Sequence, residues 1–330
     1  MRRKTGAVIA LAILFTGLLM PFSLGSPEKP LVVASIAPLA SIVQDAFGDS
    51  VNVVYIIPLG ADPHEYQLTA SQIELLRKAD VIVTTGGHLP VEKRIKELRE
   101  EGTITAEALF IDDYKREGFR YLQERWYQNK DNPHGVWLDP YNALAIAKAT
   151  GVALEKTDPA NSETYAEEYG NFEVRVKTIV EAYRALIGTN HTAVIQMPPD
   201  EYAIEWLGVK AVASIKPEEE VPAIGVDDLV PTAKRVDLIV YGANSPDQLK
   251  DAAKELALKS GKPTAEITVF WKDVPYTEVL IRNSAAVVNA LGGKTPLKTP
   301  AQKSDVTEYV MLSLVTGIVL GTALGVILKR

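Results

Sequence analysis

Residues 51–64, VNVVYIIPLGADPH, join an apolar run to a polar turn that ends in a histidine. The run at 51–57 is rich in β-branched and aromatic residues, which predicts a buried strand. Glycine, aspartate and proline follow it, and these residue types end strands and form turns. The chain has only four histidines among its 330 residues. Their placement is therefore informative, and His64 stands where a strand is predicted to stop.

The same unit recurs along the chain, because apolar runs alternate with helical patterns. The runs are nearly continuous rather than alternating in polarity, which is typical of parallel strands covered on both faces. We therefore predict an α/β fold with two parallel-sheet lobes. The expected strands are 31–37, 51–57, 80–85 and 107–112 in the first lobe, and 191–197, 210–215 and 236–242 in the second.

Residues 158–187 separate the two lobes. After Asp158 and Pro159, aromatic and aliphatic residues recur on one face at helical spacing. The length fits one long rigid helix that joins the lobes. Two shorter helices broken at Gly170 are the alternative.

Both ends of the chain are strongly apolar. Residues 1–25 begin with basic residues and continue as an apolar stretch, the pattern of a signal peptide or an N-terminal anchor. Residues 309–328 carry no charge and are followed by two basic residues. Since about 20 apolar residues cross a bilayer as a helix, this run predicts a transmembrane helix, with a buried core helix as the alternative. Basic flanks stay on the cytoplasmic side, so we expect an extracytoplasmic body anchored in the cell membrane by the C-terminal helix.

Charge and composition exclude several kinds of function. The formal net charge is −7 and no basic stripe interrupts the acidic body, which argues against nucleic-acid binding. The chain has no cysteine, so disulfides, thiolate metal sites and cysteine nucleophiles are excluded. Any metal site must use nitrogen and oxygen ligands.

Three of the four histidines fall after predicted strands. His64 and His88 each follow the carboxyl end of a strand, and His134 lies in a loop that can reach the same edge. Ligands of open parallel sheets bind outside those ends, and three imidazoles there can converge on one cation. A solvated or hydrogen-bonding side chain is the alternative for each histidine alone. His191 precedes a strand, so we expect it on the surface, away from this edge.

The stretch VVASIAPLASIVQDAFGDSVNVVYIIPLGADPHEYQLTASQIELLRKADVIVTTG, with its GADPH element and a later histidine before Trp-Leu-Asp-Pro, resembles a known family. The family is that of the zinc- and manganese-type solute-binding proteins of metal ABC transporters, also called cluster A-I or cluster 9, and the resemblance covers roughly residues 30–292. It implies two α/β lobes joined by one long helix, with the metal at their interface. It also implies that His64 is the first metal ligand and His134 the second.

The sequence departs from the family pattern at several positions. Two residues rather than one separate His134 from the Trp-Leu-Asp-Pro segment. The third ligand of the family, a histidine, falls on Met197, so Asp200, Glu201 or His88 would have to replace it.

The fourth ligand of the family is a carboxylate just after the last strand. Glu266 is the candidate, with Asp273 behind it. A mixture of imidazoles and carboxylates suits Zn²⁺ or Mn²⁺ as the transported ligand, and also Fe²⁺. Because the ligands must be deprotonated, binding should weaken as the pH falls through the histidine range. The zinc importers of the family often carry a long loop rich in His, Asp and Glu, and this sequence has none. Its absence argues slightly against a dedicated zinc scavenger.

The predicted organisation has six parts: a signal peptide or N-terminal anchor (1–25), an N-terminal metal-binding lobe (30–157), a linking helix (158–187), a C-terminal lobe (188–294), a spacer (295–308) and a transmembrane helix (309–328). We predict a membrane-tethered receptor that delivers a divalent metal ion to an ABC permease, and no enzyme activity. One alternative is a surface adhesion or metal-storage module. An exported metal-dependent hydrolase is the other, although the HExxH and GxSxG motifs of hydrolases are absent.

Overall fold

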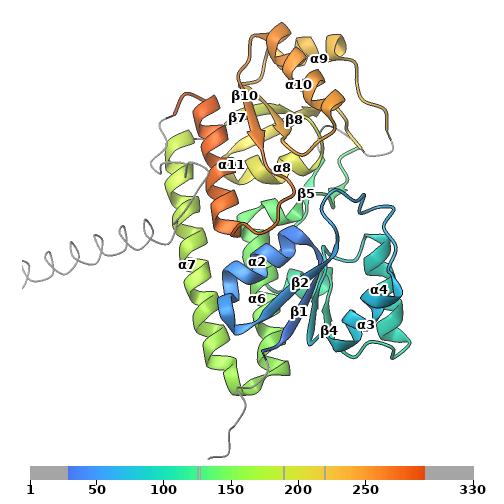
Figure 1. Ribbon diagram of the computed structural model, residues 1–330. Helices are drawn as coiled ribbons and strands as arrows, with labels where there is room; N and C mark the ends of the chain where they lie inside the picture. The colour runs from blue at the N-terminus through green and yellow to red at the C-terminus, as the bar shows by residue number, and fades with distance from the viewer. Residues whose placement is uncertain (1–28, 125, 127, 189, 219–220, 294–330) are drawn as a thin grey trace, which may run out of the picture.

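The computed structural model describes residues 29–124, 126, 128–188, 190–218 and 221–293 (Figure 1). The predicted segments 1–25, 295–308 and 309–328 therefore lie outside the described residues. Within the described part of the chain, no helix is both long and apolar enough to cross a membrane.

The first lobe contains a four-stranded parallel sheet in the order β2-β1-β3-β4. Helices α3 and α4 lie on one side of this sheet, and α2 and α6 lie on the other (Figure 1). The strands are β1 (Leu31–Ile36), β2 (Asn52–Ile57), β3 (Val81–Val83) and β4 (Glu107–Leu109); the helices are α2 (Ala37–Phe47), α3 (Ala70–Lys78), α4 (Pro90–Glu100), α5 (Ile111–Arg116) and α6 (Pro140–Thr157). Val32 and Val33 at the centre of β1 are completely buried, as expected for a strand covered on both faces.

The second lobe contains another four-stranded parallel sheet, in the order β10-β9-β7-β8. Its strands are β7 (His191–Ile195), β8 (Val209–Ser214), β9 (Leu238–Gly242) and β10 (Thr264–Ile267); its helices are α8 (Pro199–Ile204), α9 (Val226–Ala233), α10 (Asp247–Ser260) and α11 (Tyr276–Ala290). The prediction of an α/β fold with two parallel-sheet lobes is thus confirmed. A short antiparallel pair, β5 (Leu122–Gln123) and β6 (Asp131–Asn132), lies between the lobes.

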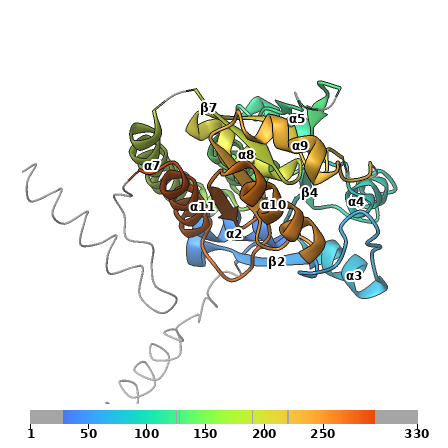
Figure 2. The same cartoon turned by 90° about the horizontal axis from the view of Figure 1, so that it is seen from above.

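One helix, α7 (Ser162–Ile187), runs along both lobes. It packs on α2 and α6 of the first lobe and on α11 of the second, and Figure 2 shows α7 and α11 side by side. Its aromatic and aliphatic stripe is buried, including Tyr165, Phe172 and Tyr183. Gly170 lies within the helix, so the alternative of two helices broken there is wrong.

The lobes share one hydrophobic core, which continues from β1 and α2 through α7 to α11 and β9. Hydrogen bonds also cross between them. The Trp137 indole donates to the Val269 carbonyl (2.9 Å), and the Tyr202 hydroxyl donates to the Asn132 carbonyl. The two lobes are therefore packed against each other over a large surface rather than connected by a linker alone.

Candidate metal site

His64, His88 and His134 meet at the edge of the first lobe that faces the second. His64 lies in the loop between β2 and α3, His88 between β3 and α4, and His134 just after β6. Their ring centroids form a triangle, with His64 at 6.2 Å from His88 and 5.6 Å from His134, and with 5.9 Å between His88 and His134. The structure thus brings together the three histidines that the ends of the strands indicated.

The triangle is somewhat wider than a closed metal site. With bonds of about 2.0–2.1 Å to each nitrogen, rings around one tetrahedral ion would have centroids about 5 Å apart. Accordingly, no set of three or more His, Cys, Asp or Glu side chains among the described residues is already arranged to hold a metal ion. An approach of the rings by about 1 Å would close the triangle around a cation.

A buried carboxylate holds the loop of His88 in place. Glu92 on α4 is fully buried and accepts hydrogen bonds from the Ser35 hydroxyl (2.6 Å), the Thr85 backbone N–H (2.6 Å) and the Gly87 N–H (3.0 Å). The Thr85 hydroxyl also donates to Glu92 (2.9 Å) and lies 3.1 Å from His88 Nδ1. Because that hydroxyl donates its proton to Glu92, it accepts one from His88 Nδ1. The Nε2 lone pair of His88 is then left for a ligand.

An asparagine connects the loop of His134 to the second lobe. Asn132 Oδ1 accepts the His134 backbone N–H (3.0 Å), while Asn132 Nδ2 donates to the Pro198 carbonyl (3.0 Å) and to Glu201 Oε2 (3.1 Å). Asn132 is completely buried. The position of His134 therefore depends on the contact between the lobes, and the hydrogen bonds of Asn132 determine it.

Burial also sets the charge of the site. It lowers the pKa of His88 to about 4, with smaller contributions in the same direction from His64 and Lys93. It likewise lowers the pKa of His134 to about 4, helped by His88 and His64 and opposed by Glu218. Both rings are neutral at pH 7, which is the form that binds metal ions. The sequence prediction assumed an ordinary histidine pKa. Because the pKa of these two rings is about 4, protons compete with a metal ion for their nitrogens only at a lower pH than that prediction assumed.

The three rings line a cavity of about 110 Å³ between the lobes. The remaining wall is largely apolar. From the first lobe it includes Ile36, Leu89 and Trp137, and from the second lobe the described residues that line it are Met197, Pro198, Pro199 and Phe270. A cation in this cavity would face the three imidazoles, and the apolar side chains of the remaining wall would shield it from bulk water.

Comparison with known proteins identifies the family. Residues 32–290 match the family described as zinc-uptake complex component A, periplasmic. The chain belongs to this ZnuA family. Since the match includes both lobes and α7, membership covers the whole described body.

Two streptococcal relatives are similar to this ZnuA-family chain. The metal ABC transporter substrate-binding lipoprotein ScbA of Streptococcus cristatus is 29% identical over 197 residues, 56% of this chain and 59% of that protein. The manganese ABC transporter substrate-binding lipoprotein PsaA of Streptococcus mitis is 29% identical over 142 residues, 42% of this chain and 46% of that protein. The chain thus spans about half the length of the curated relatives it matches.

Solved structures share the fold. A crystal structure of ZnuA aligns with a TM-score of 0.65 at 18% identity, covering 80% of this chain and all of that one. The Mn-bound periplasmic metal binding protein from Candidatus Liberibacter asiaticus aligns with a TM-score of 0.63 at 19% identity, with the same coverage. At this identity the likeness establishes the two-lobed architecture alone.

The other predicted ligands of this ZnuA-family chain lie outside the cavity. Glu266 is exposed on β10 and accepts the Tyr241 hydroxyl (3.0 Å), so its carboxylate is directed to a neighbouring strand. Glu201 is fully buried behind the loop of His134 and accepts from Asn132. Asp273 is largely exposed on another surface, beside Lys272.

The residue at the expected third-ligand position does line the cavity. Met197 reaches it, while the buried carboxylate of Asp200 accepts the backbone N–H groups of Gln196 (3.0 Å) and Met197 (3.1 Å) and so holds this turn. The fourth histidine, His191, lies at the amino end of β7, where its Nε2 is 2.9 Å from the Ile187 carbonyl oxygen. It is remote from the triangle, in agreement with the expectation from the sequence.

Sequence reasoning missed one carboxylate next to the triangle. Glu218 Oε2 lies 3.9 Å from His134 Nε2. This residue follows the carboxyl end of β8 in the second lobe. The rule that singled out His64 and His88, applied to the second sheet, would have indicated the Pro-Glu-Glu-Glu sequence at 217–220 as well.

Proposed function

We propose that this chain is the extracytoplasmic receptor of a metal ABC transporter. It binds one divalent transition-metal ion in the cavity between the lobes and delivers that ion to the permease. The observation that supports this most is the histidine triangle, in which two rings have pKa values that keep them neutral at pH 7. The names of ScbA and PsaA, substrate-binding lipoproteins of metal ABC transporters, agree with this role.

The ligands in this proposal are His64, His88 and His134. All three come from the first lobe, and His88 replaces the ligand that the family pattern places at Met197. A site dominated by imidazoles suits Zn²⁺ better than Mn²⁺, because Mn²⁺ prefers oxygen ligands and stands lower in the general order of affinity. We therefore propose Zn²⁺ as the tighter ligand and Mn²⁺ as the weaker one.

Metal titration of the purified full chain in detergent tests the binding. We expect one Zn²⁺ per chain, with Mn²⁺ displaced in competition. Protein that binds none of Zn²⁺, Mn²⁺ and Fe²⁺ stoichiometrically would contradict the proposal. Deleting the gene should also lower cellular accumulation of the bound metal; unchanged accumulation would favour a storage or adhesion module, and turnover of a substrate by the loaded protein would favour a hydrolase.

The tether is part of the proposal and rests on the apolar run at 309–328. The full chain should sediment with membranes and need detergent for extraction, whereas a chain of residues 26–300, which lacks both apolar ends, should be released. Release of the full chain by high salt alone would contradict a membrane-spanning anchor.

A further inference from the structure

The Glu218 side chain extends from the second lobe toward the histidine triangle. Its Oε2 lies 3.9 Å from His134 Nε2, and both side chains are partly buried. This distance is too long for a hydrogen bond but close to the spacing of two ligands on one ion. Two ligands with bonds of about 2.0–2.1 Å to a tetrahedral cation are separated by about 3.3 Å. A movement of less than 1 Å would bring the carboxylate to that spacing.

The second lobe otherwise presents an apolar wall to the rings. Its described residues that line the cavity are Met197, Pro198, Pro199 and Phe270, which are weak ligands or none for a hard or borderline cation. Glu201 and Glu266, the carboxylates expected from the sequence, point elsewhere. Glu218, in contrast, lies within 4 Å of a histidine of the triangle.

Neighbouring groups hold Glu218 beside the site. Glu124, which is buried and directly follows β5, is in contact with the Glu218 carboxyl group. The two carboxyl groups therefore form a pair next to His134. The Trp126 indole donates to the Pro217 carbonyl (3.5 Å), so the first lobe holds the residue before Glu218 close to the site.

We propose that Glu218 is the carboxylate ligand with which the second lobe completes the metal site. This inference rests on the proposed function, since it adds a ligand to the same cation. The site is then three imidazoles from the first lobe and one carboxylate from the second, joined through the ion. The oxygen ligand matters most for Mn²⁺, which prefers carboxylate to imidazole.

Titration of Zn²⁺ and Mn²⁺ into the full chain tests this assignment. Three proteins are compared: wild type, Glu218→Gln, and the matched control Glu65→Gln, which removes one negative charge from an exposed position beside His64. We expect Glu218→Gln to weaken Zn²⁺ binding by about 10-fold and Mn²⁺ binding by about 100-fold. Glu65→Gln should bind both ions as wild type does.

The outcomes separate the two proposals. Wild-type binding together with undiminished binding by Glu218→Gln would overturn the role of Glu218 and leave the receptor function standing. Equal weakening by both variants would also overturn it, because a general charge effect would then suffice. Failure of the wild type to bind either ion would overturn the proposed function itself.

A second variant covers the case in which Glu218→Gln does not fold. Glu218→Asp keeps the charge and shortens the side chain by one methylene. We expect the Glu218→Asp protein to bind Mn²⁺ more tightly than proteins with a neutral residue at this position, such as the Glu218→Ala variant. X-ray absorption of the Zn²⁺ complexes gives an independent reading: one oxygen neighbour present in wild type should be lost or lengthened in the variants, and identical spectra would overturn the proposal.

Discussion

Gly135 lies directly against Pro199 across the boundary between the lobes. A Cβ atom on Gly135 would stand 2.5 Å from Pro199 Cα and 2.8 Å from its carbonyl oxygen, and φ at Gly135 is +82°. Only glycine meets both conditions, because a side chain would strain the backbone and collide with the facing main chain. The residue directly after His134 is thus the one that lets the lobes approach beside the site.

Gly135→Ala should therefore lower the stability of the protein by more than the backbone strain alone would. We expect a loss of stability of about 2–4 kcal/mol, together with weaker Zn²⁺ binding, because the collision displaces His134 from the other rings. Thermal unfolding and metal titration measure the two effects. Gly118→Ala is the control, since Gly118 has φ of +96° but nothing within 4 Å of a Cβ. Equal losses in the two variants would show that the contact with Pro199 is unimportant.

Removal of each ring of the triangle should weaken Zn²⁺ binding strongly. For His64→Ala, His88→Ala and His134→Ala we expect losses of about 100-fold or more, exceeding the 10–100-fold that loss of a residue supporting a ligand causes. Competitive titration with a chelating dye measures the affinity, and His191→Ala is the control because that ring lies remote from the cavity. Wild-type affinity in His88→Ala would exclude His88 as a ligand and would indicate that the third ligand comes from the second lobe.

The ring protons of His88 and His134 should titrate at unusually low pH. Burial lowers both pKa values to about 4, so both rings stay neutral as the pH falls from 7 to 5 and become charged near pH 4. NMR of the metal-free protein over this range should show midpoints near pH 4 for both rings. Protonation of these two rings should then reduce metal affinity only below about pH 5. Midpoints near 6.5 for both rings would contradict the burial of the site.

Glu92→Gln should weaken metal binding without touching the metal. Glu92 accepts hydrogen bonds from the Ser35 hydroxyl and from the backbone N–H groups of Thr85 and Gly87. The NH₂ group of the glutamine amide cannot accept them, so the loop of His88 loses hydrogen bonds that hold it in place. We expect a loss of Zn²⁺ affinity of about 10–100-fold and of stability of about 2 kcal/mol. Glu97→Gln, at an exposed position on the same helix, is the control. An unchanged affinity in Glu92→Gln would show that Thr85 alone orients His88.

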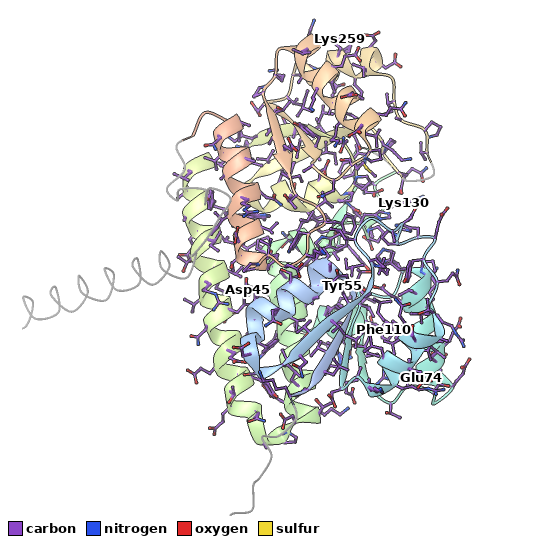
Figure 3. All side chains as sticks on the ribbon, in the orientation of Figure 1. Asp45, Tyr55, Glu74, Phe110, Lys130 and Lys259 are labelled. Atoms are coloured by element: carbon purple, nitrogen blue, oxygen red, sulfur yellow. The ribbon has the colours of Figure 1, made fainter. Side chains whose placement is uncertain are left out.

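Asp45 joins α2 of the first lobe to two other helices (Figure 3). Its carboxylate accepts both the backbone N–H and the hydroxyl of Thr277 at the start of α11 (2.8 Å each), and pairs with Arg175 on α7 (3.1 Å). Asp45→Ala should cost about 2 kcal/mol in unfolding free energy, because the first turn of α11 loses a charged acceptor. Chemical denaturation measures this against Asp251→Ala at an exposed position. A difference below about 0.5 kcal/mol would show that Asp45 contributes no more than a surface charge.

Local patterns predicted seven of the eight strands of the two large sheets, the helix α7 and the convergence of the three histidines, but not β10 or α11. Continuous apolar runs such as that around Val32 identified the buried strands, and the stripe from Tyr165 to Tyr183 identified α7. His64 and His88 followed from the rule that ligands collect at the carboxyl ends of strands. These features depend on residues near each other in the chain, where periodicity and turn chemistry are informative.

The contribution of the second lobe could not be read in the same way. Which of its residues face the triangle depends on how the lobes pack around α7, and no local pattern records that packing. Glu266 has the right charge and follows the same strand logic, but it lies on β10 and accepts a hydrogen bond from Tyr241. Glu218, which follows β8, lies closer to the rings, with its Oε2 3.9 Å from His134 Nε2. The predicted membrane segment at 309–328 stays a prediction from sequence.

The hydrophobic core that continues from β1 to α11 limits how far the lobes can move when an ion binds. Two lobes that share buried side chains cannot separate widely, since opening would expose apolar surface at roughly 25 cal/mol per Å². The loaded and empty forms should then have almost the same outline. For the receptor role proposed above, a permease would recognise the local arrangement of the loops that bear His64 and Glu218, where the two lobes meet beside the cavity.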